Sequence, residues 1–359
     1  MPNARCQLDP AITRHAAGDF QFPLGVYPVE PASPKAGYTS AFESADGGPG
    51  ADGEFEEWPD RYVFDIVVSA SRVRALCRAL IGLLPLRVFP ILDVLGNDAY
   101  REIDPYVSYD LLGLDQFMDS VRAYADFLFE DGLVGFGAMS EEPFCYFFLD
   151  EHKIATVRVE PAVKERLEKI LEAFDLHETA DAAGVDATAH EHRSILLAPD
   201  DRPDLLSPPE IVERLRDRWR LLLNTDPDRN LDEEGKDLGT TAWRCVVRFD
   251  ADDDRPPGYG EAIVAAECLR DAEECAIEAV ERLPEARNYL RNTPPKPEPD
   301  QPHAAEPSDA WTEAVPVASD RLTLDTLNEL LSSGSKKKVR PVSDLDPGKV
   351  YLAIWLGPG

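Results

Sequence analysis

Three short apolar segments in succession constrain the fold most strongly. They are LVGFGAMS at 133–140, PFCYFFLD at 143–150 and KIATVRVE at 153–160. Each has the length and the β-branched or aromatic content of a strand. Only Glu151 and His152 separate the last two, which is the spacing of a tight hairpin. The segments therefore predict an antiparallel meander.

Amphipathic segments surround the meander. Apolar residues recur at helical spacing in 71–84, 115–130 and 162–174, and strand-like runs lie at 61–70 and 86–96. Pro90 inside the second run indicates an edge strand or a bulged one, because proline cannot donate to a ladder. Ser207 and Glu210 form a capping box for a helix that begins at Pro208. This order predicts an α+β domain over 61–225, with helices packed on a largely antiparallel sheet and ferredoxin-like packing as one option.

The rest of the chain predicts a tail, a linker and a second body. Residues 1–60 are rich in Pro, Gly, Ala and acid, which predicts a disordered acidic tail whose aromatic residues can dock on the folded body. Residues 226–240 are expected as an acidic linker. Residues 241–359 predict a smaller α/β domain with a Pro-rich insertion at 284–308. Within it we expect strands at 242–251, 310–318 and 349–356, an Ala-rich helix at 261–283 and a short helix at 324–331.

Charge narrows the range of partners. The chain has 37 basic and 68 acidic residues and a formal charge of -31, which repels phosphate backbones and anionic membrane surfaces. We therefore expect no nucleic-acid and no membrane partner. A DNA-mimicking role is disfavoured because the carboxylates are spread over tails, loops and helices. The beginning of the sequence lacks the apolar core of a secretion signal, and the six cysteines form no Cys-x-x-Cys pair, which predicts free thiols and a cytoplasmic location.

The stretch AHEHRSILLA contains the best candidate for a metal site. Residues two apart in a strand project to one face, so His190 and His192 can bind the same divalent metal. Further ligands would come from His177, His152 or Asp186, whereas Glu191 would point away. The predicted metal set is His190, His192 and His177. Two alternatives stay open: the histidines are the polar entrance to a buried strand at 193–198, or one of them acts in catalysis without a metal.

A second candidate lies between predicted elements. The segment ILDVLGNDAYREIDPYVSYDLLG is rich in tyrosine and aspartate, and we interpret it as a recognition loop. Its candidate binding residues are Tyr100, Asp104, Tyr106, Tyr109 and Asp110. Paired acids such as Asp93 and Asp98 are also compatible with glycoside hydrolysis or magnesium binding, but a chain this acidic contains chance pairs. The basic run at 336–340 is typical of a protected strand edge.

The motifs of common enzymes are missing. The sequence contains no phosphate-binding Gly-x-x-x-x-Gly-Lys loop, no His-Glu-x-x-His and no Gly-x-Ser-x-Gly. The leading hypothesis is a non-enzymatic intracellular binding or regulatory protein with a protein partner and no cofactor. The alternative is a metal-dependent hydrolase that uses the His190 and His192 pair. A third hypothesis is a structural role in which the strand at 349–356 pairs with another chain.

Overall fold

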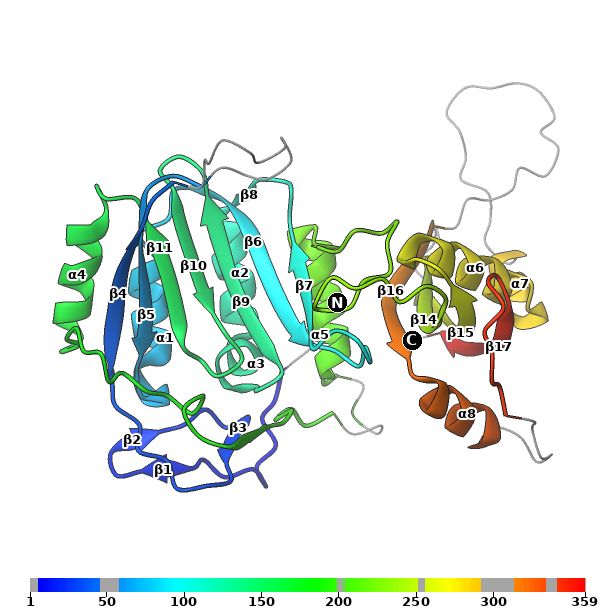
Figure 1. The fold of residues 1–359 in the computed structure, drawn as a ribbon, viewed down its shortest axis with the longest axis horizontal. Helices are drawn as coiled ribbons and strands as arrows, with labels where there is room; N and C mark the ends of the chain where they lie inside the picture. The colour runs from blue at the N-terminus through cyan, green and yellow to red at the C-terminus, as the bar shows by residue number, and fades with distance from the viewer. Residues whose placement is uncertain are drawn as a thin grey trace. The chain divides into compact units, whose positions relative to one another are not determined.

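The computed structural model describes residues 6–45, 58–198, 202, 204–250, 256–291, 313–333 and 341–358. The chain divides into two compact units. Unit 1 comprises Met1–Leu95 and Ile103–Asn224, and unit 2 comprises Gly96–Glu102 and Thr225–Gly359. Both units combine helices with antiparallel sheets, so the fold is mixed α+β (Figure 1). Within the described ranges, no helix has the length and apolar content that crossing a membrane requires.

Unit 1 contains a nine-stranded sheet. Its order is β13 (Leu222–Leu223), β7 (Ile103–Val107), β6 (Arg87–Leu95), β9 (Val134–Ser140), β10 (Cys145–Leu149), β11 (Ala155–Val159), β5 (Arg61–Val67) and β4 (Gly37–Glu43), and β8 (Leu112–Gly113) pairs with β6. The β9–β10–β11 pairings are antiparallel, which confirms the predicted meander. The sheet has more strands than the β-α-β-β-α-β pattern of ferredoxin-like packing provides.

Helices cover one face of this sheet. In Figure 1, α1 (Ala70–Ile81), α2 (Leu114–Ala123) and α3 (Ala125–Glu130) lie behind the strands. Leu167 of α4 (Lys164–Ala173) and Trp219 of α5 (Pro208–Trp219) join the same core. Alternate strand residues such as Phe136 and Phe147 are fully buried against these helices. Because burial of one such side chain contributes about 1.5–3 kcal/mol, this face is the main source of stability in unit 1.

The N-terminal segment is ordered over residues 6–45, so the expected disordered tail is wrong for this part. It forms β1 (Ala16–Ala17), β2 (Phe20–Gln21), β3 (Val26–Pro28) and β4. Phe22 and Val26 are buried with Val185, and β4 pairs with β5 at the edge of the sheet. The composition is polar on average, but these few apolar side chains and the strand pairing offset the entropy of ordering. Residues 46–57 lie outside the described ranges.

Pro90 does not mark an edge. Strand β6 lies between β7 and β9, contrary to expectation. On one side β6 pairs with β8 at Arg87 and Val88 and with β7 from Ile91 onward, so Pro90 falls in the gap between these two ladders. Its missing N–H therefore breaks no pairing on that side, and a central strand tolerates the proline.

Two other local predictions for unit 1 need correction. The helix expected over 115–130 is interrupted at Tyr124, whose ψ of 29° separates α2 from α3. The strand expected at 193–198 does not form. The strand is the histidine stretch itself, β12 (His190–His192), which pairs with β3. The backbone groups of Ile195 and Leu197 instead bond to Asp9 and Gln7 of the N-terminal segment.

Unit 2 contains a four-stranded antiparallel sheet. Its order is β16 (Glu313–Leu322), β14 (Thr241–Asp250), β15 (Gly258–Ala266) and β17 (Val350–Pro358). The helices are α6 (Leu269–Glu281), α7 (Pro284–Arg291) and α8 (Leu324–Ser333). Residues 261–266 thus belong to strand β15 and not to the start of an Ala-rich helix, because their Ala, Ile and Val side chains are buried in the sheet. Residues 284–291 are helical and not a linker, and 292–308 and 336–340 lie outside the described ranges.

A buried ion pair ties the 96–102 loop into unit 2. Arg321 is 3% exposed and its guanidinium donates to both carboxylate oxygens of Asp98 at 2.8–3.0 Å. Asn230 accepts a further bond from Arg321 and is itself buried. Residues 226–240, expected as a linker, therefore contribute a buried side chain to this unit.

Candidate metal centre

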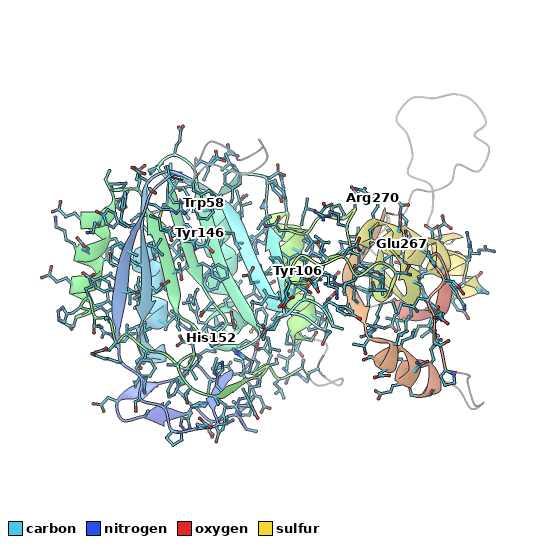
Figure 2. The ribbon with its side chains drawn as sticks, in the orientation of Figure 1. Trp58, Tyr106, Tyr146, His152, Glu267 and Arg270 are labelled. Carbon is cyan, nitrogen blue, oxygen red and sulfur yellow. The ribbon has the colours of Figure 1, made fainter. Side chains whose placement is uncertain are left out.

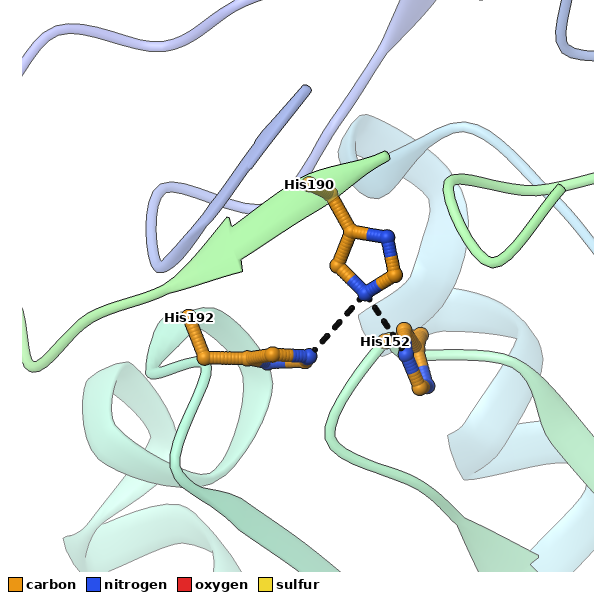
Figure 3. Close-up of side chains that lie close together, drawn as sticks. All are labelled: His152, His190 and His192. Carbon is orange, nitrogen blue, oxygen red and sulfur yellow. Dashed lines mark hydrogen bonds between the residues drawn. The ribbon is translucent and has the colours of Figure 1, made fainter. Parts of the chain in front are cut away.

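Three imidazole rings converge in unit 1. Nε2 of His190 lies 3.0 Å from Nε2 of His152 and 3.1 Å from Nε2 of His192 (Figure 3). The ring centroids are 4.8–4.9 Å apart, and the rings are close to perpendicular to one another. All three side chains are half-buried. The three nitrogens therefore surround a single point.

Local structure explains why these residues meet. His190 and His192 occupy alternate positions of β12 and project to the same face, whereas Glu191 between them is exposed. His152 comes from the turn that joins β10 to β11, where Lys153 adopts a φ of 65°. Figure 2 shows His152 at the end of the sheet where β10 turns into β11. The β10–β11 hairpin thus supplies His152, and the separate strand β12 supplies His190 and His192.

Hydrogen bonds determine the tautomers of two rings. Nδ1 of His190 lies 2.7 Å from the carbonyl oxygen of Thr188, and Nδ1 of His192 lies 2.7 Å from that of Gly132. A carbonyl can only accept, so each Nδ1 carries the hydrogen. In the neutral imidazole the lone pair is then on Nε2. The two Nε2 lone pairs face each other, and a cation between them relieves their repulsion.

The third ring is oriented by carboxylates. Nδ1 of His152 lies 3.4 Å from Oδ2 of Asp150 and 3.3 Å from Oε1 of Glu151. Burial lowers the pKa of His152, but Asp150, Glu151 and Asp186 outweigh it and the net pKa is raised. The pKa of His192 is lowered by burial and by the other positive groups. A carboxylate behind a histidine that binds metal through its other nitrogen is a recurrent arrangement, because it fixes the ring and increases its basicity.

The spacing fits a small transition-metal ion. Zn²⁺ binds imidazole nitrogen at about 2.0–2.1 Å in tetrahedral geometry, which places two ligand nitrogens roughly 3.3 Å apart. The distances of 3.0 and 3.1 Å are close to this separation. Neutral imidazoles suit Zn²⁺, Cu²⁺, Fe²⁺ and Ni²⁺, whereas Mg²⁺ and Ca²⁺ prefer oxygen ligands. Three protein ligands leave one tetrahedral position for water or a substrate.

Two glycines hold the loops around the cluster together. The N–H of Arg193 donates to the carbonyl of Gly25 at 2.8 Å, and the N–H of Gly132 donates to the carbonyl of Arg193 at 3.2 Å. A Cβ atom on Gly25 would lie 2.0 Å from the backbone nitrogen of Gly132, and one on Gly132 would lie 2.1 Å from the Gly25 oxygen. Only glycine permits this approach. The same Gly132 provides the carbonyl that orients His192.

Buried charges support the same loops. Asp131 is fully buried and accepts bonds from the N–H groups of Leu133 and Ile195 and from Oγ of Ser194. Burial raises its pKa. Nζ of Lys153 donates to the carbonyl of Val134, and burial lowers the pKa of this amine to about 8. These contacts connect the start of β9 with both histidine-bearing segments.

The predicted ligand set and the observed cluster share His190 and His192. The third imidazole of the cluster is His152. His177 is exposed, and its backbone carbonyl accepts from Tyr38. Asp186 accepts from the N–H of Gly184. The available signal for His152 was its place in a hairpin turn, but sequence alone does not show which turn faces β12.

The residues of the predicted recognition loop have different environments. Tyr100 belongs to unit 2 and helps to line a cavity of about 180 Å³ there. Asp104 and Tyr106 belong to unit 1 and are buried. Tyr109 is 65% exposed and bonds to Asn224, and Asp110 pairs with Arg220.

Comparison of the chain with protein-family models, with curated proteins and with solved structures finds no match.

Proposed function

We propose that His152, His190 and His192 bind one Zn²⁺ through their Nε2 atoms and that the protein is a metal-dependent hydrolase. The observation that supports this is the convergence of three Nε2 atoms while every Nδ1 faces an oxygen. When all three rings are neutral and no metal is bound, these contacts bring lone pairs together. With a metal, each contact becomes favourable.

The number of protein ligands favours a catalytic centre. Structural zinc sites usually have four protein ligands, whereas catalytic sites have three and bind water in the fourth position. Zinc held by these three histidines would lower the pKa of a bound water to about 7 and would supply a hydroxide nucleophile for hydrolysis at neutral pH. The role of Asp150 and Glu151 would be to hold His152 for metal binding.

The metal assignment is tested by elemental analysis of protein without a histidine tag. We expect about one zinc per chain, and loss of this zinc in His152→Ala, His190→Ala and His192→Ala. His177→Ala is the matched control, because this exposed histidine lies outside the cluster. Folded wild-type protein that binds no divalent transition metal, even after dialysis against zinc, would contradict the proposal.

The hydrolase assignment needs its own test. We expect zinc-loaded protein to hydrolyse 4-nitrophenyl acetate or bis(4-nitrophenyl) phosphate and to lose this activity in His190→Ala and after chelation. If the zinc is bound but neither substrate is turned over faster by wild type than by His190→Ala, the centre is a metal-binding site without this activity.

A second candidate is a non-enzymatic binding protein, and strand β17 favours it. Among the described residues β17 pairs with β15 alone, so its other edge is open for strand pairing. Val350, Ile354 and Leu356 on this strand are 40%, 38% and 53% exposed. Pairing with a second copy is tested by sedimentation velocity, in which Ile354→Lys should abolish dimers and His190→Ala should retain them.

A further inference from the structure

An arginine stands on the face of the unit 1 sheet that the helices leave uncovered. Arg158 of β11 lies between two aromatic rings, with its guanidinium carbon 5.0 Å from the ring centre of Trp58 and 5.2 Å from that of Tyr146. Figure 2 shows Trp58 and Tyr146 together over the sheet, and Figure 1 shows the helices on its other side. Aromatic faces attract a guanidinium, so the two rings hold this side chain in place.

Arg158 has no carboxylate partner among the described residues. Its Nε atom is buried and makes no hydrogen bond, whereas the neighbouring Arg61 pairs with Glu43 at 2.8 Å. The chain has 68 acidic side chains for 37 basic ones, so an unpaired guanidinium is unexpected. A buried donor without a partner costs stability, and an anion bound to the other guanidinium nitrogens would stabilise the uncompensated charge.

Surrounding contacts make the arginine position rigid. Tyr146 stacks on Phe148 at an interplanar angle of 26°, and the ring of Phe148 covers Gly137 of β9. Trp58 also contacts the ring of Phe144. The rings beside Arg158 are therefore fixed by their own neighbours, and little side-chain entropy remains to be lost when a ligand binds.

Apolar side chains adjoin the arginine on the same face. Tyr146 is paired with Arg158 on one side and with Met139 on the other, and Met139 is paired with Phe89. Met139 and Phe89 are half-buried and lie on the face opposite the helices. Adjacent strands are about 4.8 Å apart, so this apolar row extends roughly 10 Å from Tyr146.

We propose that Arg158 is the recognition residue of a binding site for an amphiphilic organic anion. The guanidinium binds the carboxylate, sulfonate or phosphate head through two parallel hydrogen bonds, and the apolar body lies on Met139 and Phe89. This site goes beyond the metal centre and does not depend on it.

Octanoate is the probe, and isothermal titration calorimetry of the full chain is the measurement. Hydrogen bonds to a charged group contribute about 1.5–3 kcal/mol, so Arg158→Gln should weaken octanoate binding by at least about tenfold. Arg158→Lys should weaken it less, because the charge is kept and the paired donors are lost. Octanol should bind far more weakly than octanoate. Arg122→Gln is the matched control, since Arg122 is exposed and pairs with Asp119 on α2.

Octanoate binding by the variants distinguishes a site at Arg158 from an effect of the metal centre. Retention of wild-type affinity in His190→Ala together with loss in Arg158→Gln supports the site and shows that it is independent of the metal centre. Equal octanoate affinity in wild type and Arg158→Gln overturns the proposal, and so does failure of wild type to bind octanoate. If Arg158→Gln does not fold by circular dichroism, unchanged affinity in Arg158→Lys overturns the proposal instead.

Discussion

Nε2 of His190 lies 3.1 Å from Nε2 of His192, although Nδ1 of each ring already faces a carbonyl oxygen at 2.7 Å. Both Nε2 atoms are therefore acceptors in the neutral state. The arrangement is unfavourable alone and favourable around a cation. Metal binding and folding of unit 1 should consequently be coupled.

Removal of the metal should destabilise the protein. Ligand binding to the native state alone adds about 4 kcal/mol when the free ligand is a thousandfold above its dissociation constant. We expect chelation to lower the midpoint of the thermal transition of unit 1 by several degrees, and zinc to restore it. Scanning calorimetry checks this, with His190→Ala as the control that should not respond to zinc. A wild-type midpoint that is the same with chelator and with zinc would count against the coupling.

The carboxylates behind His152 should tune zinc affinity. Loss of such partners typically lowers metal affinity about 10- to 100-fold. We expect this loss in the double variant Asp150→Asn, Glu151→Gln, which keeps the side-chain shapes but removes both charges next to Nδ1. Competition with a fluorescent chelator measures the affinity. Asp181→Asn serves as the control because it removes an exposed charge that pairs with Lys35. Equal zinc affinities of wild type, the double variant and Asp181→Asn would show that the two carboxylates do not influence metal binding.

Gly25→Ala should damage both stability and metal binding. The new Cβ would lie 2.0 Å from the backbone nitrogen of Gly132, so the two loops must separate. We expect a loss of about 3 kcal/mol in the free energy of unfolding, as for severe overpacking, and weaker zinc binding because Gly132 orients His192. Gly18→Ala is the comparison. Gly18 has a φ of 59° and open space around it, so only a backbone cost of about 1 kcal/mol is expected.

The predictions that the structure confirms come from patterns in which residues close together in the sequence determine the local structure. The β9–β10–β11 meander and the capping box at Ser207 are examples. The helix predicted from residue 261 is wrong at 261–266, because alanine favours helices in isolation whereas pairing with β14 and burial select a strand. The order of residues 6–45 was missed because few apolar side chains carry it, among them Phe22 and Val26.

Two of the three histidines of the candidate centre are predictable, because their local spacing determines how they lie. The alternation of a strand indicates that His190 and His192 share a face, and both belong to the cluster. His152 is 38 residues away from His190 along the chain. Its proximity depends on the pairing of β12 with β3 and on the contact between Gly25 and Gly132. No local pattern encodes these tertiary contacts, which is why the sequence favours His177, nearer to His190 along the chain, as the third ligand.

Asp93 should make stability fall as pH rises from about 4 to about 7. Burial raises the pKa of this carboxyl to about 7, with a further contribution from Glu151. Below the ordinary pKa of about 4 the group is protonated in both states and has no effect. Between the two values the unfolded chain releases the proton and the folded protein retains it, so the unfolded state is increasingly favoured. Above about pH 7 the folded protein bears the full cost of a buried charge.

Asp93→Asn removes this cost. We expect the variant to be more stable than wild type by about 1–4 kcal/mol at pH 8 and nearly equal to it at pH 4. Urea unfolding at both pH values measures the difference, and Asp65→Asn, an exposed acid on β5, controls for general loss of negative charge. If Asp93→Asn gave the same gain at both pH values, the gain would come from packing or net charge. The buried carboxyl of Asp93 would then not be the source of the pH dependence.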